Sequence, residues 1–425
     1  MRKILIISYY FEPCSLTASQ RTTFWAKNLS SFGFYPIIIT RNWNENISKP
    51  NDVLLNKKNE YKLQKTESYE VHSLPFKNNL RDRILLSKKS NYFLKILQKT
   101  LTLKDLILIH FSIKINPVDS FYYQTEEIIK KEQINGILIS GAPFELFKIG
   151  YLINKKFNIP WIADYRDDWN TNEVLRYNNI ERILNIFNKY SEQKWIKTSS
   201  AITSISKHYT KKISIFNNKI GYTIENGFQE YIDNHHIKSN KFIIVYNGTL
   251  YKSQKIEEFM DAFINFSSTK DNVQLKFIGA GFDNEQRIRL EKYIPKLKDK
   301  LFITNRVTKK EIINEQRNAS ILLMFSHTNC KGIPSSKLYE YFSFGKYIMS
   351  TPKDNDIIDQ KLLEYELGYS FDLKRDIEFF LHDKYNEFTN HTLNFIQFPG
   401  KNEFIKSQHR FNQTEKLAQI LHTYF

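Results

Sequence analysis

The first forty residues combine a largely apolar run with a helical pattern. Residues 3–9 form a run ended by Pro13, which predicts a buried parallel strand. A helical pattern follows at about 20–31, and Gly33 stands where a capping glycine would close that helix. Residues 36–40 predict a second strand. This order of strand, helix and strand is typical of a βαβ unit.

The alternation continues along both halves of the chain. In the first half we expect further strands at 136–140, 160–163, 201–204 and 221–224, and helices at 144–157 and 180–198. In the second half we expect strands at 241–246, 273–279, 301–304, 321–325 and 346–350, and helices at 256–267, 284–293, 309–317 and 336–344. Two successive doubly wound α/β halves are the economical interpretation.

The pattern predicts how the two halves are divided. We expect Rossmann-like domains at 1–232 and 241–400, joined by a charged, histidine-containing linker at 233–240. Residues 401–425 have a helical apolar pattern, and we expect this C-terminal helix to return to the first domain.

Residues 78–115 differ from the rest because they mix many basic side chains with large apolar ones. The basic residues are Arg81, Arg83, Lys88, Lys89, Lys95, Lys99 and Lys104. One interpretation is a basic amphipathic helix held at an anionic membrane surface, from which salt would release it. The other is an ordinary surface helix packed on the core.

Composition and charge narrow the function classes. The 425 residues carry a formal net charge of +17, which favours anionic partners, although no nucleic-acid-binding module stands out. Only Cys14 and Cys330 occur, so neither a disulfide scaffold nor a cysteine metal cluster is expected, and a reducing cytoplasm fits best. Every apolar run is too short for a signal-peptide core or a membrane span.

The most specific segment is 332–341, GIPSSKLYEY. It places Ser335, Ser336 and Lys337 at a predicted junction of loop and helix, where free backbone N–H groups attract phosphate. Glu340 lies one helical turn after Ser336 and faces the same side. A carboxylate beside a phosphate site is suited to accepting hydrogen bonds from ribose hydroxyls. The alternative is a capping loop followed by a surface Glu–Lys pair.

This segment, with the following Gly345-Lys346, resembles the donor-binding helix of the family-4 GT-B glycosyltransferases, also described as glycosyl transferases group 1. The family usually carries Glu-x7-Glu, whose second Glu binds the donor ribose. Glu340 matches the second position, and Gly332 stands at the first. The resemblance implies two facing Rossmann-like domains, with the nucleotide-sugar donor bound by the second and the acceptor by the first.

The resemblance also implies a reaction. A sugar passes from a nucleotide sugar, with a UDP-sugar favoured, to a glycan or lipid-linked acceptor in bacterial surface-polysaccharide, lipopolysaccharide or glycoprotein-glycan assembly. The family transfers with retention, and its chemistry needs no metal or cofactor. We therefore expect an enzyme at the inner face of the cytoplasmic membrane. A GT-B sugar-nucleotide epimerase and an inactive basic scaffold at the membrane remain as alternatives.

The resemblance assigns further donor-binding residues to the second domain. Gly248 and Lys255 match a Gly-Arg…Lys pair that neutralises the donor diphosphate, with Thr249 in place of the arginine. Gly279 lies in a matching glycine-rich turn, and Arg306 can supply part of the missing positive charge. Leu338, inside the donor helix, is also expected at the donor.

In the first domain the resemblance points to the acceptor and to the reacting groups. Ser15, Thr17, Ser19 and Arg21 stand in and after the loop that lines the family's acceptor site. The block 164–169, DYRDDW, follows the carboxyl end of a predicted strand, where open α/β sheets bind ligands. We expect Asp164, Arg166 and Asp167 to be catalytic: a carboxylate takes the acceptor proton or orients the acceptor, and Arg166 screens developing charge. The alternative is a structural ion-pair network.

One candidate metal motif is Asp354-Asn355-Asp356. Its D-x-D pattern is common by chance, and it lies beyond the donor helix, so we expect no catalytic metal there.

Overall fold

The computed structural model describes residues 1–44, 50–54, 60–87, 91–114, 118–171, 179–232, 239–327, 331–393 and 403–425. The chain forms two compact units. Unit 1 comprises Met1–Glu225 and Gln413–Phe425, and unit 2 comprises Asn226–Asn412. Most of the expected linker (233–238), and Lys88, Lys89 and Cys330, lie outside the described residues.

The sheet of unit 1 has the strand order β3-β4-β2-β1-β5-β6-β7-β8. All neighbours are parallel except β3 and β4, which pair antiparallel at the edge. Its strands are β1 (Arg2–Ser8), β2 (Phe34–Arg41), β3 (Lys62–Lys65), β4 (Glu70–Leu74), β5 (Gly136–Gly141), β6 (Trp161–Tyr165), β7 (Ala201–Ser204) and β8 (Gly221–Thr223). Ile4 to Ile7 are fully buried, as expected for a central strand covered on both faces.

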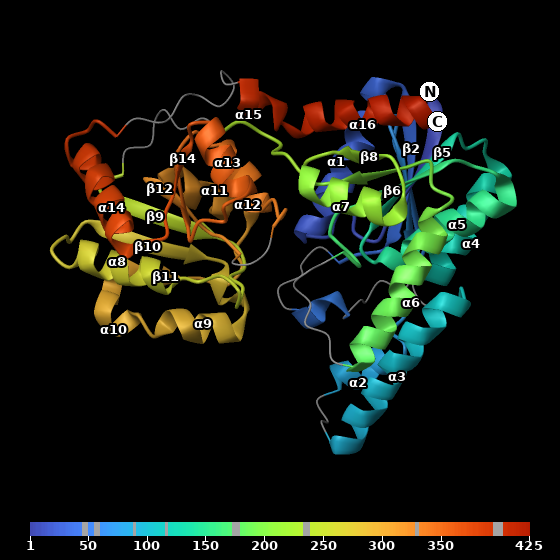
Figure 1. Ribbon diagram of the computed structural model, residues 1–425, viewed down its shortest axis with the longest axis horizontal. Helices are drawn as coiled ribbons and strands as arrows, with labels where there is room; N and C mark the ends of the chain where they lie inside the picture. Colours follow the sequence, from blue (N-terminus) through green and yellow to red (C-terminus); the bar gives the residue numbers. More distant parts are fainter. Residues whose placement is uncertain are drawn as a thin grey trace. The chain divides into compact units, whose positions relative to one another are not determined.

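The helices of unit 1 are α1 (Gln20–Asn28), α2 (Leu80–Leu86), α3 (Tyr92–Phe111), α4 (Val118–Lys131), α5 (Phe147–Phe157), α6 (Asn179–Ile196) and α7 (Lys207–Asn217). In Figure 1, α2 and α3 extend away from the sheet. Short 3-10 turns are η1 (Thr17–Ser19), η2 (Leu29–Phe32), η3 (Pro50–Val53) and η4 (Phe144–Leu146). The helix predicted at 20–31 is therefore α1 followed by η2, and Gly33 ends it in the left-handed conformation with φ 84°.

The C-terminal helix α16 (Arg410–Tyr424) begins in unit 2 and continues into unit 1 from Gln413. Leu417, Ala418 and Leu421 are buried in the unit 1 core, in the same cluster as Ile6 and Phe34. The predicted return of this helix to the first domain is confirmed.

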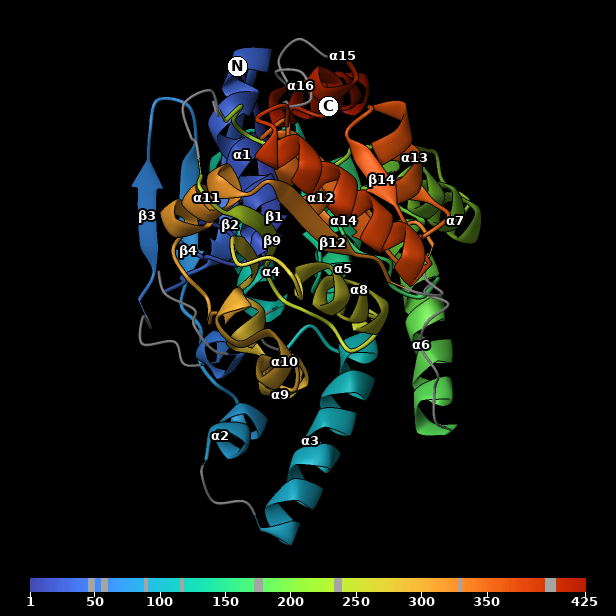
Figure 2. The same cartoon turned by 90° about the vertical axis from the view of Figure 1, so that its left-hand side faces the viewer.

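Unit 2 has a fully parallel sheet in the order β11-β10-β9-β12-β13-β14 (Figure 2). Its strands are β9 (Phe242–Asn247), β10 (Val273–Ile278), β11 (Leu301–Ile303), β12 (Ile321–Phe325), β13 (Tyr347–Thr351) and β14 (Gly368–Ser370). Its helices are α8 (Glu257–Ser267), α9 (Asn284–Glu291), α10 (Ile294–Leu297), α11 (Lys309–Asn318), α12 (Ser336–Phe342), α13 (Ile357–Glu364), α14 (Lys374–Thr389) and α15 (Glu403–Ser407), with 3-10 turns η5 (Ala280–Phe282) and η6 (Lys298–Lys300).

The predicted α/β class with two Rossmann-like parallel sheets is confirmed. Helix order and strand order place the carboxyl ends of β9, β10 and β12 side by side in unit 2, and those of β1, β5 and β6 in unit 1. These two sheet edges carry the candidate site residues. Among the described residues, no helix is both long enough and apolar enough to cross a membrane.

Candidate functional site

Two glycines end neighbouring strands at the sheet edge of unit 2. Gly248 follows β9 with φ 93°, and Gly279 follows β10 with φ 86°. A Cβ on Gly279 would lie 3.6 Å from the Gly248 Cα, and a Cβ on Gly248 would lie 3.1 Å from the Lys337 Cε. The positive φ and the close packing both favour glycine here. The backbone can therefore approach a ligand closely at this edge.

Lys337, in the first turn of α12, lies across this pair of strands. Its Nζ donates to the Thr249 carbonyl at 3.3 Å and lies 4.9 Å from the centre of the Tyr246 ring. Burial lowers the pKa of Lys337 to about 8, and the negative charge of Glu340 acts against this shift. A partly desolvated ammonium group whose hydrogen bond is to a carbonyl is suited to receive an anion.

Glu340 lies in α12, about one helical turn after Ser336. Two side-chain amides hold its carboxylate in place. Asn247 Nδ2 lies 3.4 Å from Oε2, and Gln316 Nε2 donates to Oε1 at 3.2 Å. Burial raises the pKa of the Glu340 carboxyl, while Gln316 and Lys337 lower it. The structure thus brings Lys337 and Glu340 together beside Gly248, as the sequence motif predicts. Two neutral donors leave the carboxylate able to accept more hydrogen bonds.

The other residues of the donor motif have different environments. Ser335 is the N-cap of α12, and its side chain makes no capping hydrogen bond; Ser336 is exposed. Leu338 is fully buried in the core of unit 2, and its N–H donates to the Ser335 carbonyl. The Leu338 side chain therefore has a packing role, which does not fit its expected place at the donor.

The two remaining basic candidates of unit 2 are exposed. Lys255 is exposed directly after Gln254, which fixes its loop by accepting from the Tyr251 N–H at 3.0 Å. The Arg306 guanidinium stacks 4.0 Å from the centre of the Phe282 ring. This contact places Arg306 beside the turn after Gly279 and gives it a packing role alongside any electrostatic one.

The structure adds His327, which the sequence analysis did not select. Its Nδ1 lies 2.9 Å from the Ser253 hydroxyl oxygen, just beyond the carboxyl end of β12. Burial, and after it the positive charge of Lys337, lowers the pKa of His327. The imidazole is therefore part of the same polar group. A single histidine after a strand carries no sequence signal that separates it from the other nine.

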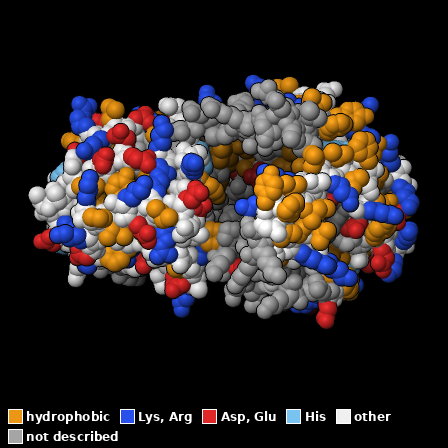
Figure 3. Space-filling view, turned by 90° about the horizontal axis from the view of Figure 1, so that it is seen from below, with side chains coloured by type: hydrophobic (Ala, Val, Ile, Leu, Met, Phe, Trp, Pro, Cys, Tyr) orange, Lys and Arg blue, Asp and Glu red, His pale blue; other side chains and the backbone are white. Residues whose placement is uncertain are grey.

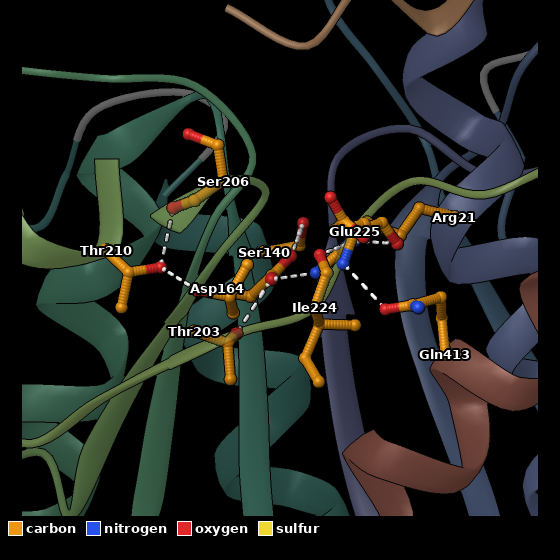
Figure 4. Close-up of polar contacts among 10 residues, drawn as sticks. Arg21, Ser140, Asp164, Thr203, Ser206, Thr210, Ile224, Glu225 and Gln413 are labelled. Carbon is orange, nitrogen blue, oxygen red and sulfur yellow. Dashed lines mark hydrogen bonds and ion pairs between the residues drawn. The ribbon is translucent and has the colours of Figure 1, made fainter. Parts of the chain in front are cut away.

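In unit 1, Asp164 and Arg21 are partners of each other (Figure 4). The Asp164 carboxylate is fully buried and accepts from Arg21 Nη2 at 2.9 Å, Ser140 Oγ at 2.9 Å and Thr203 Oγ1 at 2.8 Å. Arg21 also donates to the Ile224 and Glu225 carbonyls at 2.6 and 3.2 Å. These contacts tie α1, β5, β6, β7 and the end of β8 together. Neither an acceptor-binding role for Arg21 nor a catalytic role for Asp164 fits this burial.

Arg166 and Asp167 follow β6, and their side chains are more exposed than that of Asp164. Arg166 donates to the Asp167 carboxylate through Nε at 3.2 Å and Nη2 at 3.1 Å, and its guanidinium lies 5.3 Å from the centre of the Tyr10 ring. The Asp167 side chain is 59% exposed, whereas that of Asp168 is 3% exposed and ion-paired with Lys212 at 3.9 Å. Among the three acids of this block, only Asp167 is available to a ligand.

A buried carboxyl group fixes the loop that carries Arg166 and Asp167. Glu192 accepts from the Tyr165 hydroxyl at 2.8 Å, Asn170 Nδ2 at 2.6 Å and Asn217 Nδ2 at 3.0 Å. Burial raises the pKa of Glu192, and the two asparagines and the tyrosine act against it. Tyr165 and Asn170 are the two ends of this loop, so Glu192 holds both.

The loop expected to line the acceptor site contains one serine that stabilises the loop and two hydroxyl residues that are exposed. The Ser19 hydroxyl donates to the Cys14 and Leu16 carbonyls at 2.7 and 2.8 Å, which stabilises the loop itself. Ser15 and Thr17 are exposed and accessible to a ligand. The structure also adds the half-buried Glu145, which lies beyond the end of β5. Burial raises the pKa of its carboxyl group, and a hydrogen bond from its own backbone N–H partly opposes this rise. An isolated Glu offered no sequence signal.

In the candidate motif Asp354-Asn355-Asp356, for which no catalytic metal was expected, both carboxylates accept hydrogen bonds from backbone N–H groups. The Asp354 carboxylate accepts from the N–H groups of Asp356, Ile358 and Asp359 at 3.0, 2.9 and 3.0 Å. The Asp356 carboxylate accepts from the Gly332 N–H. Both acids therefore shape the loop before α13, and a carboxylate from Asp356 lies against Gly332, where the resembling family has a glutamate.

The sequence of residues 227–382 matches the family described as glycosyl transferases group 1. The matched region lies within unit 2 and includes Gly248, Lys337 and Glu340. Through this domain the chain is similar to the group 1 glycosyl transferases. It is an enzyme of the glycosyltransferase class, with the GT-B fold. No curated protein sequence matches the chain.

Solved structures of glycosyltransferases share its fold. Sucrose-phosphate synthase from Thermosynechococcus elongatus is 12% identical with a TM-score of 0.64, and covers 100% of this chain and 99% of its own. A glycosyltransferase from Rickettsia africae is 15% identical with a TM-score of 0.61, covering 99% and 97%. HepE from Anabaena, in complex with UDP-glucose, is 9% identical with a TM-score of 0.57, covering 100% of both chains.

Proposed function

We propose that this glycosyltransferase moves a sugar from a UDP-sugar to a glycan or lipid-linked acceptor in the assembly of a cell-surface polysaccharide, lipopolysaccharide or glycoprotein glycan. The observation that carries the proposal is the grouping of Lys337 and Glu340 beside the glycine-ended strands β9 and β10. A cation and a carboxylate grouped in this way match a diphosphate and a ribose. The UDP-glucose bound to the similarly folded HepE supports uridine as the base.

Each donor residue has a separate task in this proposal. Lys337 and Lys255 neutralise the diphosphate, and the backbone after Gly248 and Gly279 approaches it closely. Glu340 accepts from the ribose hydroxyls, with Asn247 and Gln316 holding its carboxylate in place. During transfer the bond between the anomeric carbon and the diphosphate oxygen breaks, and the leaving charge is stabilised by the lysines, without a metal or a cofactor.

On the acceptor side the proposal gives the chemistry to Arg166 and Asp167. The exposed Asp167 carboxylate orients the acceptor hydroxyl or takes its proton as the new bond to the anomeric carbon forms. Arg166, whose side chain is 19% exposed, screens the charge that develops between donor and acceptor. The hydroxyl groups of Ser15 and Thr17 form hydrogen bonds with the acceptor. The sugar is transferred with retention, as in the family that the donor motif resembles.

We also propose that the enzyme works on the cytoplasmic face of the inner membrane as a peripheral protein. Support comes from the net charge of +17 and from the basic residues of α2 and α3, which suit an anionic leaflet.

The experiment is to incubate the purified full chain with a panel of nucleotide sugars and to measure nucleotide release with and without lipid-linked or glycan acceptors. The proposal expects UDP release from one UDP-sugar, accelerated by an acceptor that gains the sugar. Lys337→Ala removes the lysine proposed to bind the diphosphate, and Lys296→Ala, at an exposed position, is its control. A loss of activity in Lys337→Ala alone is then due to the site and not to the loss of one positive charge. Conversion of the sugar without transfer would identify an epimerase, and failure of every donor to bind would contradict the proposal.

A further inference from the structure

Helix α3 exposes large apolar side chains along most of its length. The exposed fractions are 75% for Tyr92, 78% for Phe93, 46% for Ile96, 41% for Leu97, 37% for Leu103, 37% for Leu106, 41% for Ile107 and 73% for Phe111. Isolated exposed apolar residues are normal on a soluble protein, but a row of this length on one helix needs an explanation.

These side chains form one face of α3, opposite the face that packs on unit 1. By helical spacing, Leu94, Leu101 and Leu108 lie together on the inward side with the buried Ile109. Phe93, Ile96, Leu103 and Ile107 lie on the outward side. The helix is therefore apolar on both faces, and packing within unit 1 accounts for only one of them.

Helix α6 adds a second set of exposed apolar residues beside the first. Ile186 is 68% exposed, Phe187 41% and Tyr190 64%. His110 near the end of α3 hydrogen-bonds the Ser191 hydroxyl of α6 at 2.6 Å, and its ring lies 5.9 Å from that of Phe187. Both helices extend from unit 1 on the same side (Figures 1 and 2).

Hydrogen bonds to neighbouring elements fix the C-terminal end of α3 in unit 1. Lys148 Nζ donates to the Ile109 carbonyl at 2.7 Å and to the Ser112 carbonyl at 2.9 Å. Together with the His110–Ser191 bond, these contacts cap the end of α3 and leave its other end, at Tyr92, pointing away from the sheet.

The charges around this apolar face are mostly positive. Helix α3 carries Lys95, Lys99 and Lys104, and the described side chains of α6 include Lys189 and Lys194. Among the described acidic groups of α2 and α3, Asp105 accepts from Asn79, and Asp82 is buried and paired with Arg81. Figure 3 looks onto this end of unit 1 and shows hydrophobic side chains gathered there, with Lys and Arg beside them.

We infer that the outward face of α3, with the exposed side chains of α6, inserts into the interface of an anionic lipid bilayer. The arrangement fits an interfacial helix: aromatic and aliphatic groups enter the acyl boundary while flanking lysines reach the headgroups. At about 1.5 Å per residue the twenty residues of α3 span roughly 30 Å. The inference deepens the proposed membrane location and is independent of the transfer reaction.

The same charges disfavour a second copy of this chain as the occupant. A two-fold contact through this face would bring Lys95, Lys99 and Lys104 of one copy against those of the other. Phosphate headgroups instead neutralise the lysines while the acyl chains cover the apolar side chains.

The experiment is flotation of the full chain with phosphatidylcholine vesicles, with and without phosphatidylglycerol, at low and high salt. Purely electrostatic attachment would be released by salt. Insertion predicts binding to the anionic vesicles that salt weakens but does not abolish, because the buried apolar groups are not screened.

Matched pairs of variants make the test specific to the face. Tyr92→Ser with Phe93→Ser removes side chains that are 75% and 78% exposed, and the control, Leu363→Ser with Phe379→Ser, removes side chains that are 78% and 76% exposed on unit 2. For α6, Ile186→Ser with Tyr190→Ser (68% and 64%) is matched by Ile215→Ser with Ile220→Ser (71% and 63%). We expect each test pair to lower the bound-to-free ratio about tenfold or more, and each control to leave it unchanged.

Three outcomes would overturn the inference. The first is equal binding by test and control variants, and the second is no binding to anionic vesicles. The third is a wild-type dimer in solution that the test variants convert to a monomer, which would assign the face to a second copy. Nucleotide-sugar turnover, measured on the same samples without vesicles, reports separately on the proposed reaction.

Discussion

Arg21 and Asp164 form a buried ion pair, with 2.9 Å between Nη2 and Oδ1 and side-chain exposures of 5% and 0%. The sequence motif suggested that one residue binds the acceptor and the other reacts. The pair instead joins α1 to the centre of the unit 1 sheet. This relationship leaves the expected chemistry to Arg166 and Asp167, which follow β6.

The first prediction concerns this pair. Asp164→Asn leaves the Arg21 charge buried without its partner, and removing one member of a buried pair typically costs about 3–5 kcal/mol. We expect a large fall in the thermal unfolding temperature, and Arg21→Gln should have a similar effect. The double variant should lose less than the sum of the two. An Asp164→Asn protein with unchanged stability and no transfer would restore the catalytic role.

The second prediction concerns Asp167. Because its side chain is 59% exposed, Asp167→Asn should change stability by no more than about 0.5 kcal/mol. If its carboxylate handles the acceptor hydroxyl, kcat for transfer should fall by about 10²–10⁴-fold while UDP affinity is retained. The measurement is steady-state transfer beside UDP titration. Unchanged kcat would remove Asp167 from the reaction.

The third prediction is a pH dependence of diphosphate binding. Burial lowers the pKa of Lys337 to about 8, so the attracting ammonium form is dominant below that pH and is lost above it. UDP affinity should therefore fall as the pH rises through this range, whereas uridine affinity should not. A bound anion favours the charged lysine, so the midpoint should lie above that of the free protein.

Lys337→Ala should weaken UDP more than uridine and abolish this pH dependence. Lys255→Ala should also weaken UDP preferentially, and the exposed Lys296→Ala is the control. Equal losses of UDP and uridine binding in Lys337→Ala would indicate a folding defect and would remove Lys337 from the diphosphate site.

The fourth prediction is metal independence. The Asp354 carboxylate already accepts three backbone N–H groups and Asp356 accepts that of Gly332, so neither is arranged as an open ligand. Transfer should continue in excess EDTA. Complete loss of activity that Mg²⁺ or Mn²⁺ restores would make these acids metal ligands after all.

The strongest features of the fold were predictable because they are local. The apolar run of β1, the capping glycine Gly33 and the alternation of strands and helices in unit 2 all appear in the structure as expected. Edge strand β3 was missed because three of its four residues are polar and all four are exposed, which suits a protected sheet edge but leaves no apolar pattern. Helices α4, α7 and α14 were also missed.

The candidate site was predictable only where its residues are neighbours in sequence. Lys337 and Glu340 share one short helix, so their grouping follows from helical spacing. The partnership of Arg21 with Asp164, 143 residues apart, depends on which strands become neighbours. The same is true of Gln316 beside Glu340 and of His327 beside Ser253.

The most direct test of the account is the affinity of UDP for Glu340→Gln, measured by titration calorimetry beside the wild type and the exposed control Glu364→Gln. We expect Glu340→Gln to remain folded but to bind UDP about ten- to a hundredfold more weakly, because a charged hydrogen bond to ribose, worth about 1.5–3 kcal/mol, is lost. Glu364→Gln should bind as the wild type does. Wild-type affinity in Glu340→Gln would contradict the assignment of this site to the donor nucleotide.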